Sequence, residues 1–269
     1  MPKKQWAKSV ASQWGLFLPP TRPSLSELAF IEKYILSLKI KRKNFTVGIL
    51  GSTPEYRDLC QTYGINYKCI DYSSSNFTEL GRFLRHKDTE KNLIISDWRA
   101  MKFKDSFDLF LGDHATAVVP VNEHKMVFRN IRKHCKPEAK VILKIAWRKN
   151  NRNLTHKQIF ESYRKKYYYL NPFSATWRDV VLADYNFKED AMHCQKSIES
   201  LTKSFQDGYI TDYEYKEVKK RWEVLGNFQI NIPLKDDFIK KVSEHFTVKK
   251  ITSGNDWYRK QYPILILSV

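Results

Sequence analysis

The chain has 269 residues, of which 42% are hydrophobic and 28% are charged, enough for one large α/β domain with insertions or for two small domains. No apolar run approaches the ~18 residues of a membrane span, and the charged N-terminus lacks the apolar segment of a signal peptide. The four cysteines lie far apart, which argues against a metal knuckle or a disulfide framework and predicts a cytoplasmic protein with reduced thiols.

The formal net charge is +18, and a basic excess of this size is one sign of nucleic-acid binding. The excess is spread along the whole chain, with one concentration in the segment KIKRKN at 39–44. A solvated basic surface and a surface that binds RNA or another anion both remain open.

Hydrophobic spacing predicts a helix over 24–40, capped by Ser24 or Ser26, and then an alternation of strands and helices. The expected strands cover 45–50, 67–71, 92–97, 107–113 and 139–147. The expected helices begin at Pro54, at 76 and at 122, and the last is ended by Pro137. This alternation is typical of a mainly parallel sheet with helices on both faces.

Four further helices are expected over 155–170, 173–187, 191–208 and 211–226, the last with a capping box at Thr211 and Glu214 and a stop at Gly226. A helix at 236–246 and strands at 247–254 and 263–269 follow. The short link between these two strands predicts an antiparallel pair. We therefore expect three parts: an N-terminal leader and helix at 1–44, a core at 45–150 and 227–269, and a helical insertion at 151–226.

Acidic residues end successive strands, where ligands bind in open α/β sheets. The first strand ends in a turn at Gly51, and Asp71 ends the second strand twenty residues later. This is the pattern of a nucleoside site, in which the acid accepts hydrogen bonds from ribose hydroxyls. Asp97 and Asp113 end the next two strands, so three acids are expected in register.

The segments VGILGST, CIDYS, IISDW, FDLFLGD and AKVILKI resemble the motifs of class I S-adenosylmethionine-dependent methyltransferases over about 45–147, and the resemblance resumes at 237–269. It implies a Rossmann-like, seven-stranded, mostly parallel sheet with an antiparallel last strand, helices on both faces and S-adenosylmethionine as cofactor.

The resemblance also implies roles for the strand-end residues. The turn of Gly51, Ser52 and Thr53 would meet the methionine part of the cofactor through main chain. Asp71 would hold the ribose hydroxyls beside Tyr72.

The later strand ends complete this set. Asp97 would accept from the adenine amino group beside Trp98, and Gly112 and Asp113 would lie near the methionine part and the transferred methyl group. Asp113 and His114 are the nearest candidates for a catalytic base.

The first motif departs from the family pattern, in which an acid precedes three alternating glycines. Only Gly51 is kept, because Ile49, Thr53 and Glu55 occupy the other positions. Arg57, one turn into the following helix, could instead contact the cofactor carboxylate.

Two segments outside the core are candidates for the acceptor side. The leader carries Trp14 and Arg22 around a proline-rich stretch, and such leaders often fold over the open edge of this fold as a lid. The aromatic-rich insertion occupies the place where the family builds its acceptor pocket.

The favoured function is therefore methyl transfer to a small molecule, with no metal. RNA methylation is the second hypothesis, and cyclisation or cleavage of the cofactor, or binding without catalysis, is the third. A dehydrogenase is disfavoured because G-x-G-x-x-G is absent from the first turn. The Asn/Asp-Pro-Pro-aromatic motif of amino-group methylation of DNA is also absent, and only Asp113 and Lys144 fall near the Lys-Asp-Lys-Glu set of ribose methylation.

Overall fold

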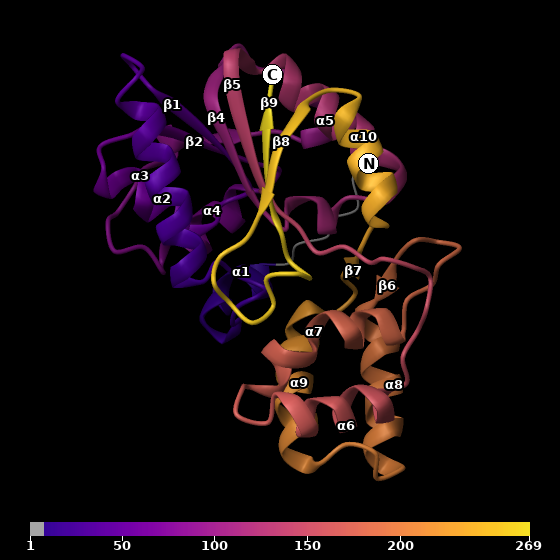
Figure 1. Cartoon of the computed structure of the whole chain (residues 1–269). Helices are drawn as coiled ribbons and strands as arrows, with labels where there is room; N and C mark the ends of the chain where they lie inside the picture. The colour runs from indigo at the N-terminus through magenta and orange to yellow at the C-terminus, as the bar shows by residue number, and fades with distance from the viewer. Residues whose placement is uncertain (1–7) are drawn as a thin grey trace.

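The structure, a computed structural model, describes residues 8–269. It has an α/β core with a group of helices at one end (Figure 1). Within the described residues, no helix has both the length and the apolar character needed to cross a membrane. The first seven residues of the expected leader lie outside the described residues.

Seven strands form the central sheet in the order β3-β2-β1-β4-β5-β9-β8. Strands β1 to β5 pair in parallel, and β9 is antiparallel to both β5 and β8. Their bounds are β1 Thr46–Leu50, β2 Asn66–Asp71, β3 Leu93–Ile95, β4 Phe107–Asp113, β5 Cys135–Lys144, β8 Thr247–Thr252 and β9 Ile264–Ser268. The predicted fold class, with its antiparallel last strand, is therefore confirmed.

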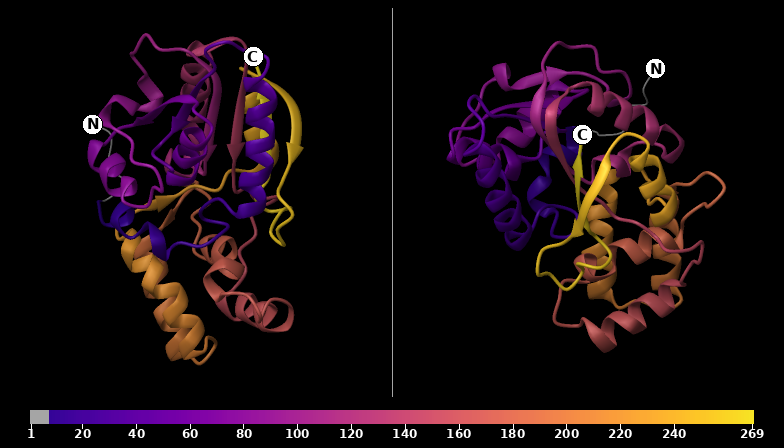
Figure 2. Two further views of the ribbon diagram at one scale, coloured as in Figure 1. Left: turned by 90° about the vertical axis from the view of Figure 1, so that its left-hand side faces the viewer. Right: turned by 45° about the horizontal axis from the view of Figure 1, so that its top comes forward.

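Helices cover both faces of this sheet, as Figure 2 shows from two further directions. Helices α2 (Leu25–Lys39) and α3 (Pro54–Thr62) pack on one face through Ile31, Ile35 and Leu59. Helices α5 (His124–Lys133) and α10 (Lys235–Ser243) pack on the other through Phe128 and Phe238. Helix α4 (Ser74–Gly81) follows β2. Because both faces are buried, the central strands are nearly continuous apolar runs.

Several helix boundaries agree with the sequence signals. Ser24 caps α2 in a capping box with Glu27, and Pro54 occupies the first turn of α3. Thr211 and Glu214 form the expected capping box of α9 (Asp212–Leu225). The N-cap hydrogen bonds satisfy amide groups that have no partner inside a helix.

The boundary at Pro137 differs from the expectation. Helix α5 ends at Lys133, and Pro137 lies inside β5 instead of ending a helix. The strand tolerates a residue without an N–H group there because its pairing with β4 shifts register between Phe107 and Leu109. Likewise, helix α8 (Cys194–Gln206) begins later than expected, because Met192–His193 forms a short strand, β6, that pairs with β7 (Gln229–Ile230).

Four helices stand between β5 and β7, at the lower end of the molecule in Figure 1. They are α6 (His156–Lys166), α7 (Pro172–Ala183), α8 and α9. A short leader helix, α1 (Lys8–Ser12), was not expected from the sequence. The leader residues Val10, Trp14 and Phe17 belong to the same buried apolar cluster as Phe173 and Trp222 of these helices. The leader and the helical group therefore share one core.

Candidate functional site

One chamber lies at the carboxyl ends of the parallel strands, between the sheet, the leader and the helical group. Its cavity volume is about 180 Å³. Its lining includes the three strand-end acids and side chains of all three parts of the chain: Val10, Trp14, Phe17, Thr21, Leu50, Gly51, Ser52, Thr53, Asp71, Tyr72, Asn76, Leu80, Ser96, Asp97, Trp98, Arg99, Asp113, His114, Ala115, Ala117, Val118, Val119, Trp177, Leu225, Phe228 and Ile230.

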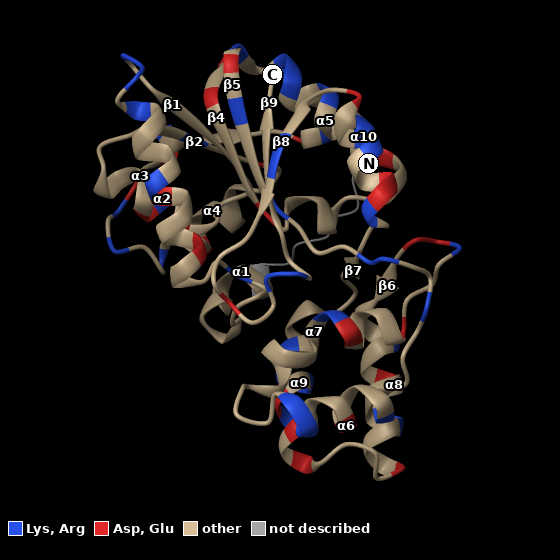
Figure 3. Ribbon diagram, viewed as in Figure 1, with Lys and Arg blue, Asp and Glu red and all other residues tan. Residues whose placement is uncertain are grey.

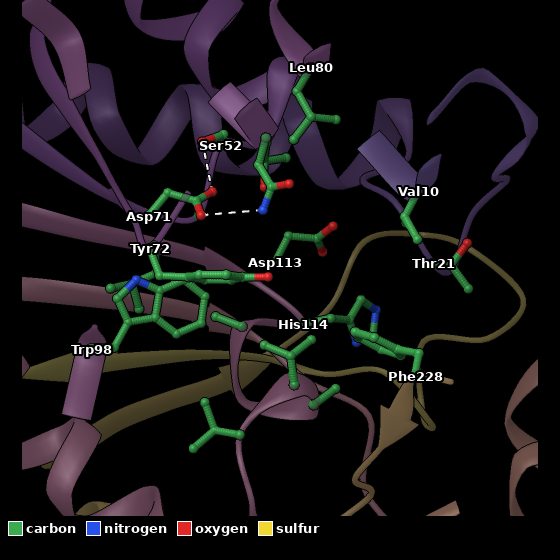
Figure 4. A pocket seen from close by; sticks show the side chains of 18 of the residues that line it. Val10, Thr21, Ser52, Asp71, Tyr72, Leu80, Trp98, Asp113, His114 and Phe228 are labelled. Carbon is green, nitrogen blue, oxygen red and sulfur yellow. Dashed lines mark hydrogen bonds between the residues drawn. The ribbon is translucent and has the colours of Figure 1, made fainter. Parts of the chain in front are cut away.

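Asp71 is held in place at the end of β2 by three donors. Its Oδ2 accepts from the Ser52 hydroxyl at 2.9 Å, and its Oδ1 accepts from the Ser73 amide at 3.1 Å and from Asn76 at 3.4 Å. Figure 4 draws the two side-chain hydrogen bonds. Burial raises the pKa of Asp71, and these hydrogen bonds oppose the rise. The carboxylate keeps accepting capacity for a further donor.

The turn after β1 leaves room for a ligand against main chain. Gly51 has φ of +86°, which favours glycine, and a Cβ atom there would meet only the Trp98 ring, at 3.7 Å. The indole nitrogen of Trp98 donates to the Ile70 carbonyl at 2.6 Å, and the Gly51 amide donates to the same carbonyl at 2.9 Å. These two bonds fix the ring beside the glycine turn.

Asp97 follows β3 and is bound by Arg99. The guanidinium donates to both Asp97 oxygens, with distances of 2.6 to 3.1 Å, and also to Glu123 at 2.7 Å. The Arg99 hydrogen bonds lower the pKa of Asp97. Arg99 therefore brings no unpaired positive charge to the chamber.

Asp113 ends β4 beside a buried lysine. Its Oδ1 lies 3.5 Å from Lys144 Nζ, has no hydrogen-bond partner among the described residues and is shielded from solvent. Burial raises the pKa of Asp113 to about 7, although Lys144 opposes the rise. In Figure 4 this carboxylate points into the space between Tyr72 and the leader residues Val10 and Thr21.

His114 follows in the left-handed conformation, with φ of 50°. Its Nε2 lies 2.9 Å from the Pro20 carbonyl, which can only accept, so Nε2 carries the proton. Its ring packs against Trp177 of α7 and Tyr262. Burial lowers the pKa of His114 to about 3, so the ring is uncharged at neutral pH.

The leader is attached to the first turn of α3. Glu55 accepts from the Trp14 indole at 3.2 Å and from Arg22 at 2.7 Å. The Arg22 guanidinium lies 5.7 Å from the Trp14 ring centroid. Trp14 lines the chamber, whereas Arg22 does not.

Two residues expected at the cofactor lie outside the chamber lining. Arg57 is fully buried and donates to both oxygens of Asp88, at 2.8 and 2.6 Å, so its charge is already paired. A Cβ atom on Gly112 would lie 2.9 Å from Leu143, so this glycine serves packing within the sheet. The contact of Arg57 with a cofactor carboxylate stays a prediction, and it would require this cation to serve both Asp88 and the ligand.

Two features of the chamber carry no signal in the sequence. Lys144 donates to Glu27 across 117 positions of the chain, a pairing with no local signal. Leu225, Phe228 and Ile230 line the far wall of the chamber, beside Trp177 of the aromatic-rich insertion. Across residues 8–269, no group of three or more His, Cys, Asp or Glu side chains is arranged to hold a metal ion.

Comparison with known proteins bears on the fold. No protein-family model matches the sequence, and no curated protein matches it significantly. Among solved structures, a methyltransferase from Clostridium acetobutylicum that depends on S-adenosylmethionine is similar over 91% of both chains, with 11% identity and a TM-score of 0.52.

Two further structures are similar to the chain. The glycopeptide N-methyltransferase MtfA, solved with S-adenosyl-L-homocysteine, is covered over 89% of its chain by 91% of this one, with 9% identity and a TM-score of 0.53. A Rhodobacter sphaeroides protein described among Zn-dependent alcohol dehydrogenases is similar over 97% of both chains, with 14% identity and a TM-score of 0.57.

At these identities the likeness concerns the fold alone. The antiparallel β9 between β5 and β8 departs from the strand order of dinucleotide-binding Rossmann domains. This seven-stranded arrangement is the one that the resemblance of the sequence motifs implies. The chain therefore has the fold of class I S-adenosylmethionine-dependent methyltransferases.

Proposed function

We propose that the protein is an S-adenosylmethionine-dependent methyltransferase that acts on a small-molecule acceptor. The observation that carries the proposal is the arrangement of three carboxylates, Asp71, Asp97 and Asp113, around one chamber beside the positive-φ turn at Gly51. Acids and an open glycine turn at the carboxyl ends of parallel strands are the arrangement that binds a nucleoside.

The chamber residues fit the cofactor. Asp71 is buried, oriented by three donors and still able to accept from ribose hydroxyls. Trp98 offers a fixed ring for the adenine, and Asp97 retains accepting capacity beside it.

The cofactor supplies an activated methyl group on a sulfonium, so the protein contributes mainly position and exclusion of water. An acceptor that carries a proton must also lose it. Asp113, whose pKa is raised to about 7, can take that proton at neutral pH. His114, whose pKa is lowered to about 3, is a hydrogen-bonding group and a poor base.

The acceptor side of the proposal rests on the leader and the helical insertion. Both contribute to the chamber wall, through Trp14 and Phe17 and through Trp177 and Leu225. We propose the leader as the lid and the insertion as the acceptor-side cap. MtfA, which has the same fold, is a glycopeptide N-methyltransferase.

The distribution of charge favours a small molecule over RNA. Figure 3 shows Lys and Arg distributed with Asp and Glu over both the core and the insertion. In the basic segment at 39–44, Arg42 pairs with Asp108 at the start of β4, and Lys39 bonds to the Tyr63 carbonyl. This segment therefore lies at the amino end of the sheet, away from the chamber.

A crystal grown with S-adenosylhomocysteine tests the proposal. We expect the ribose hydroxyls within hydrogen-bond distance of Asp71 and the adenine against Trp98. Clear density for this compound outside the chamber, or none at saturating concentration, would contradict it.

A further inference from the structure

Charge is distributed unevenly over the chamber wall. Among residues 8–269, the charged side chains of the wall come from the strand ends and the turns that follow them: Asp71, Asp97, Arg99 and Asp113. The leader contributes Val10, Trp14, Phe17 and Thr21, and the insertion contributes Trp177 and Leu225, none of which is charged. Phe228 and Ile230, which follow the insertion, add further apolar surface. Figure 4 shows the same separation, with Asp71, Tyr72 and Trp98 on one side and Val10, Thr21 and Phe228 on the other.

The described part of the wall offers no unpaired cation to an anionic molecule. Arg99 is bound by Asp97 and Glu123 at 2.6 and 2.7 Å. Lys144, the nearest other cation to Asp113, is 1% exposed and bonds to Glu27. His114 is uncharged because burial lowers its pKa to about 3.

A positively charged group is also disfavoured on the acceptor side of the chamber. The segment 115–119, which follows β4 and leads to α5, lines the chamber with Ala115, Ala117, Val118 and Val119 only. A charged group against this wall would lose its hydration without gaining a partner, which is unfavourable. Apolar surface against the same wall is stabilised in proportion to its buried area.

Asp113 and His114 lie where the two halves of the chamber meet. Each has a buried side-chain atom without a hydrogen-bond partner in the part of the chain that the structure describes, Oδ1 of Asp113 and Nδ1 of His114. Both atoms are acceptors when Asp113 is ionised and His114 carries its proton on Nε2. An O–H or N–H group is the partner that such atoms require.

We propose that the methyl acceptor is an uncharged, mainly apolar small molecule whose reacting atom is an O–H or neutral N–H group held at the end of β4. This inference rests on the proposed function, because it assigns the strand-end half of the chamber to the cofactor. It adds the substrate class: the acceptor carries neither a carboxylate nor a phosphate nor a permanent cation in its buried part.

Four fluorinated probes of one shape test the inference by fluorine NMR with the full chain at pH 7 and saturating S-adenosylhomocysteine. They are 4-fluorophenol, 1,4-difluorobenzene without a donor, 4-fluorobenzoate as an anion and 4-fluorobenzylamine as a cation. We expect the phenol to bind at least fivefold more tightly than each of the others. A charged probe that equals or exceeds the phenol, or a difluorobenzene that equals it, would overturn the inference.

A variant in the insertion provides the matched control. Leu225→Lys places a cation in the apolar wall and should raise the affinity for 4-fluorobenzoate at least fivefold, whereas Leu225→Met should leave the order of the probes unchanged. An unchanged benzoate affinity in a folded Leu225→Lys protein would contradict the placement of the acceptor.

Calorimetry with S-adenosylhomocysteine distinguishes failure of the proposed function from failure of the proposed acceptor class. If the wild-type protein does not bind this compound, the proposed function fails. If the compound binds and the probes do not discriminate, only the acceptor class fails. The wild-type probe series stands even if Leu225→Lys does not fold.

Discussion

Lys144 Nζ lies 2.8 Å from Glu27 Oε2, and each of these side chains is 1% exposed. The same ammonium group donates to the Pro20 carbonyl at 2.8 Å and to the Arg22 carbonyl at 3.1 Å. The end of β5 is thereby bonded to α2 and to the leader, directly beside Asp113. Lys144 thus joins the leader, which forms part of the chamber wall, to the sheet.

Removal of this ammonium group should be costly, because it leaves the Glu27 carboxylate buried without its cation. We expect Lys144→Met to lower the free energy of unfolding by about 3–5 kcal/mol. Urea denaturation measures the change. Lys216→Met, which breaks the exposed pair with Asp212, is the control and should have little effect. Equal effects of the two substitutions would show that the buried pair contributes no more to the free energy of unfolding than the exposed pair does.

Asp71 should control cofactor affinity. We expect Asp71→Ala to weaken binding of S-adenosylmethionine by about 2 kcal/mol, since it removes a charged acceptor for ribose hydroxyls. Isothermal titration calorimetry measures the loss, and circular dichroism checks the fold. Asp105→Ala, at an exposed site outside the chamber, should bind like the wild type. Unchanged affinity in Asp71→Ala would remove Asp71 from the cofactor site.

Asp113 should make stability depend on pH. Burial raises its pKa from 3.8 to about 7, so between about pH 4 and pH 7 the folded protein holds a proton that the unfolded chain has lost. The free energy of unfolding therefore falls as pH rises through this window. His114, with its pKa lowered from 6.5 to about 3, acts in the opposite sense below pH 6.5.

The variant Asp113→Asn isolates the contribution of Asp113 to the pH dependence of stability. Its stability relative to the wild type should increase from pH 5 to pH 7.5, as measured by urea denaturation at both values. A constant difference would mean that Asp113 titrates in the folded protein as it does in the unfolded chain.

The leader should close the chamber through Glu55. We expect Arg22→Gln to increase the dissociation rate of S-adenosylhomocysteine severalfold, because it removes the ion pair that holds the proline-rich segment against α3. Stopped-flow displacement measures the rate, with Arg178→Gln, whose ion pair with Asp179 lies outside the chamber, as control. Identical rates in both variants and the wild type would reduce the leader to a packing role.

The order of strands and helices in the core could be read from the sequence because hydrophobic periodicity and capping residues are local. Ser24, Pro54 and Thr211 each mark a boundary through a contact within one turn. The placement of acids at strand ends was also accessible, because parallel strands end at one edge of the sheet.

Residues whose partners lie far along the chain could not be placed in this way. Arg57 appeared free for a ligand until the fold brought Asp88 to it, 31 positions away. Gly112 is predicted near the methionine part of the cofactor, and the structure adds a packing contact with the Leu143 side chain on β5. Both outcomes depend on tertiary packing, which single-sequence patterns do not contain.

Calorimetric titration of the wild-type chain with S-adenosylhomocysteine and, separately, with NAD tests cofactor binding in the chamber most directly. We expect saturable one-to-one binding of S-adenosylhomocysteine in the micromolar range and no saturable binding of NAD. Binding of NAD without S-adenosylhomocysteine, or of neither compound by the folded protein, would contradict the assignment of this chamber.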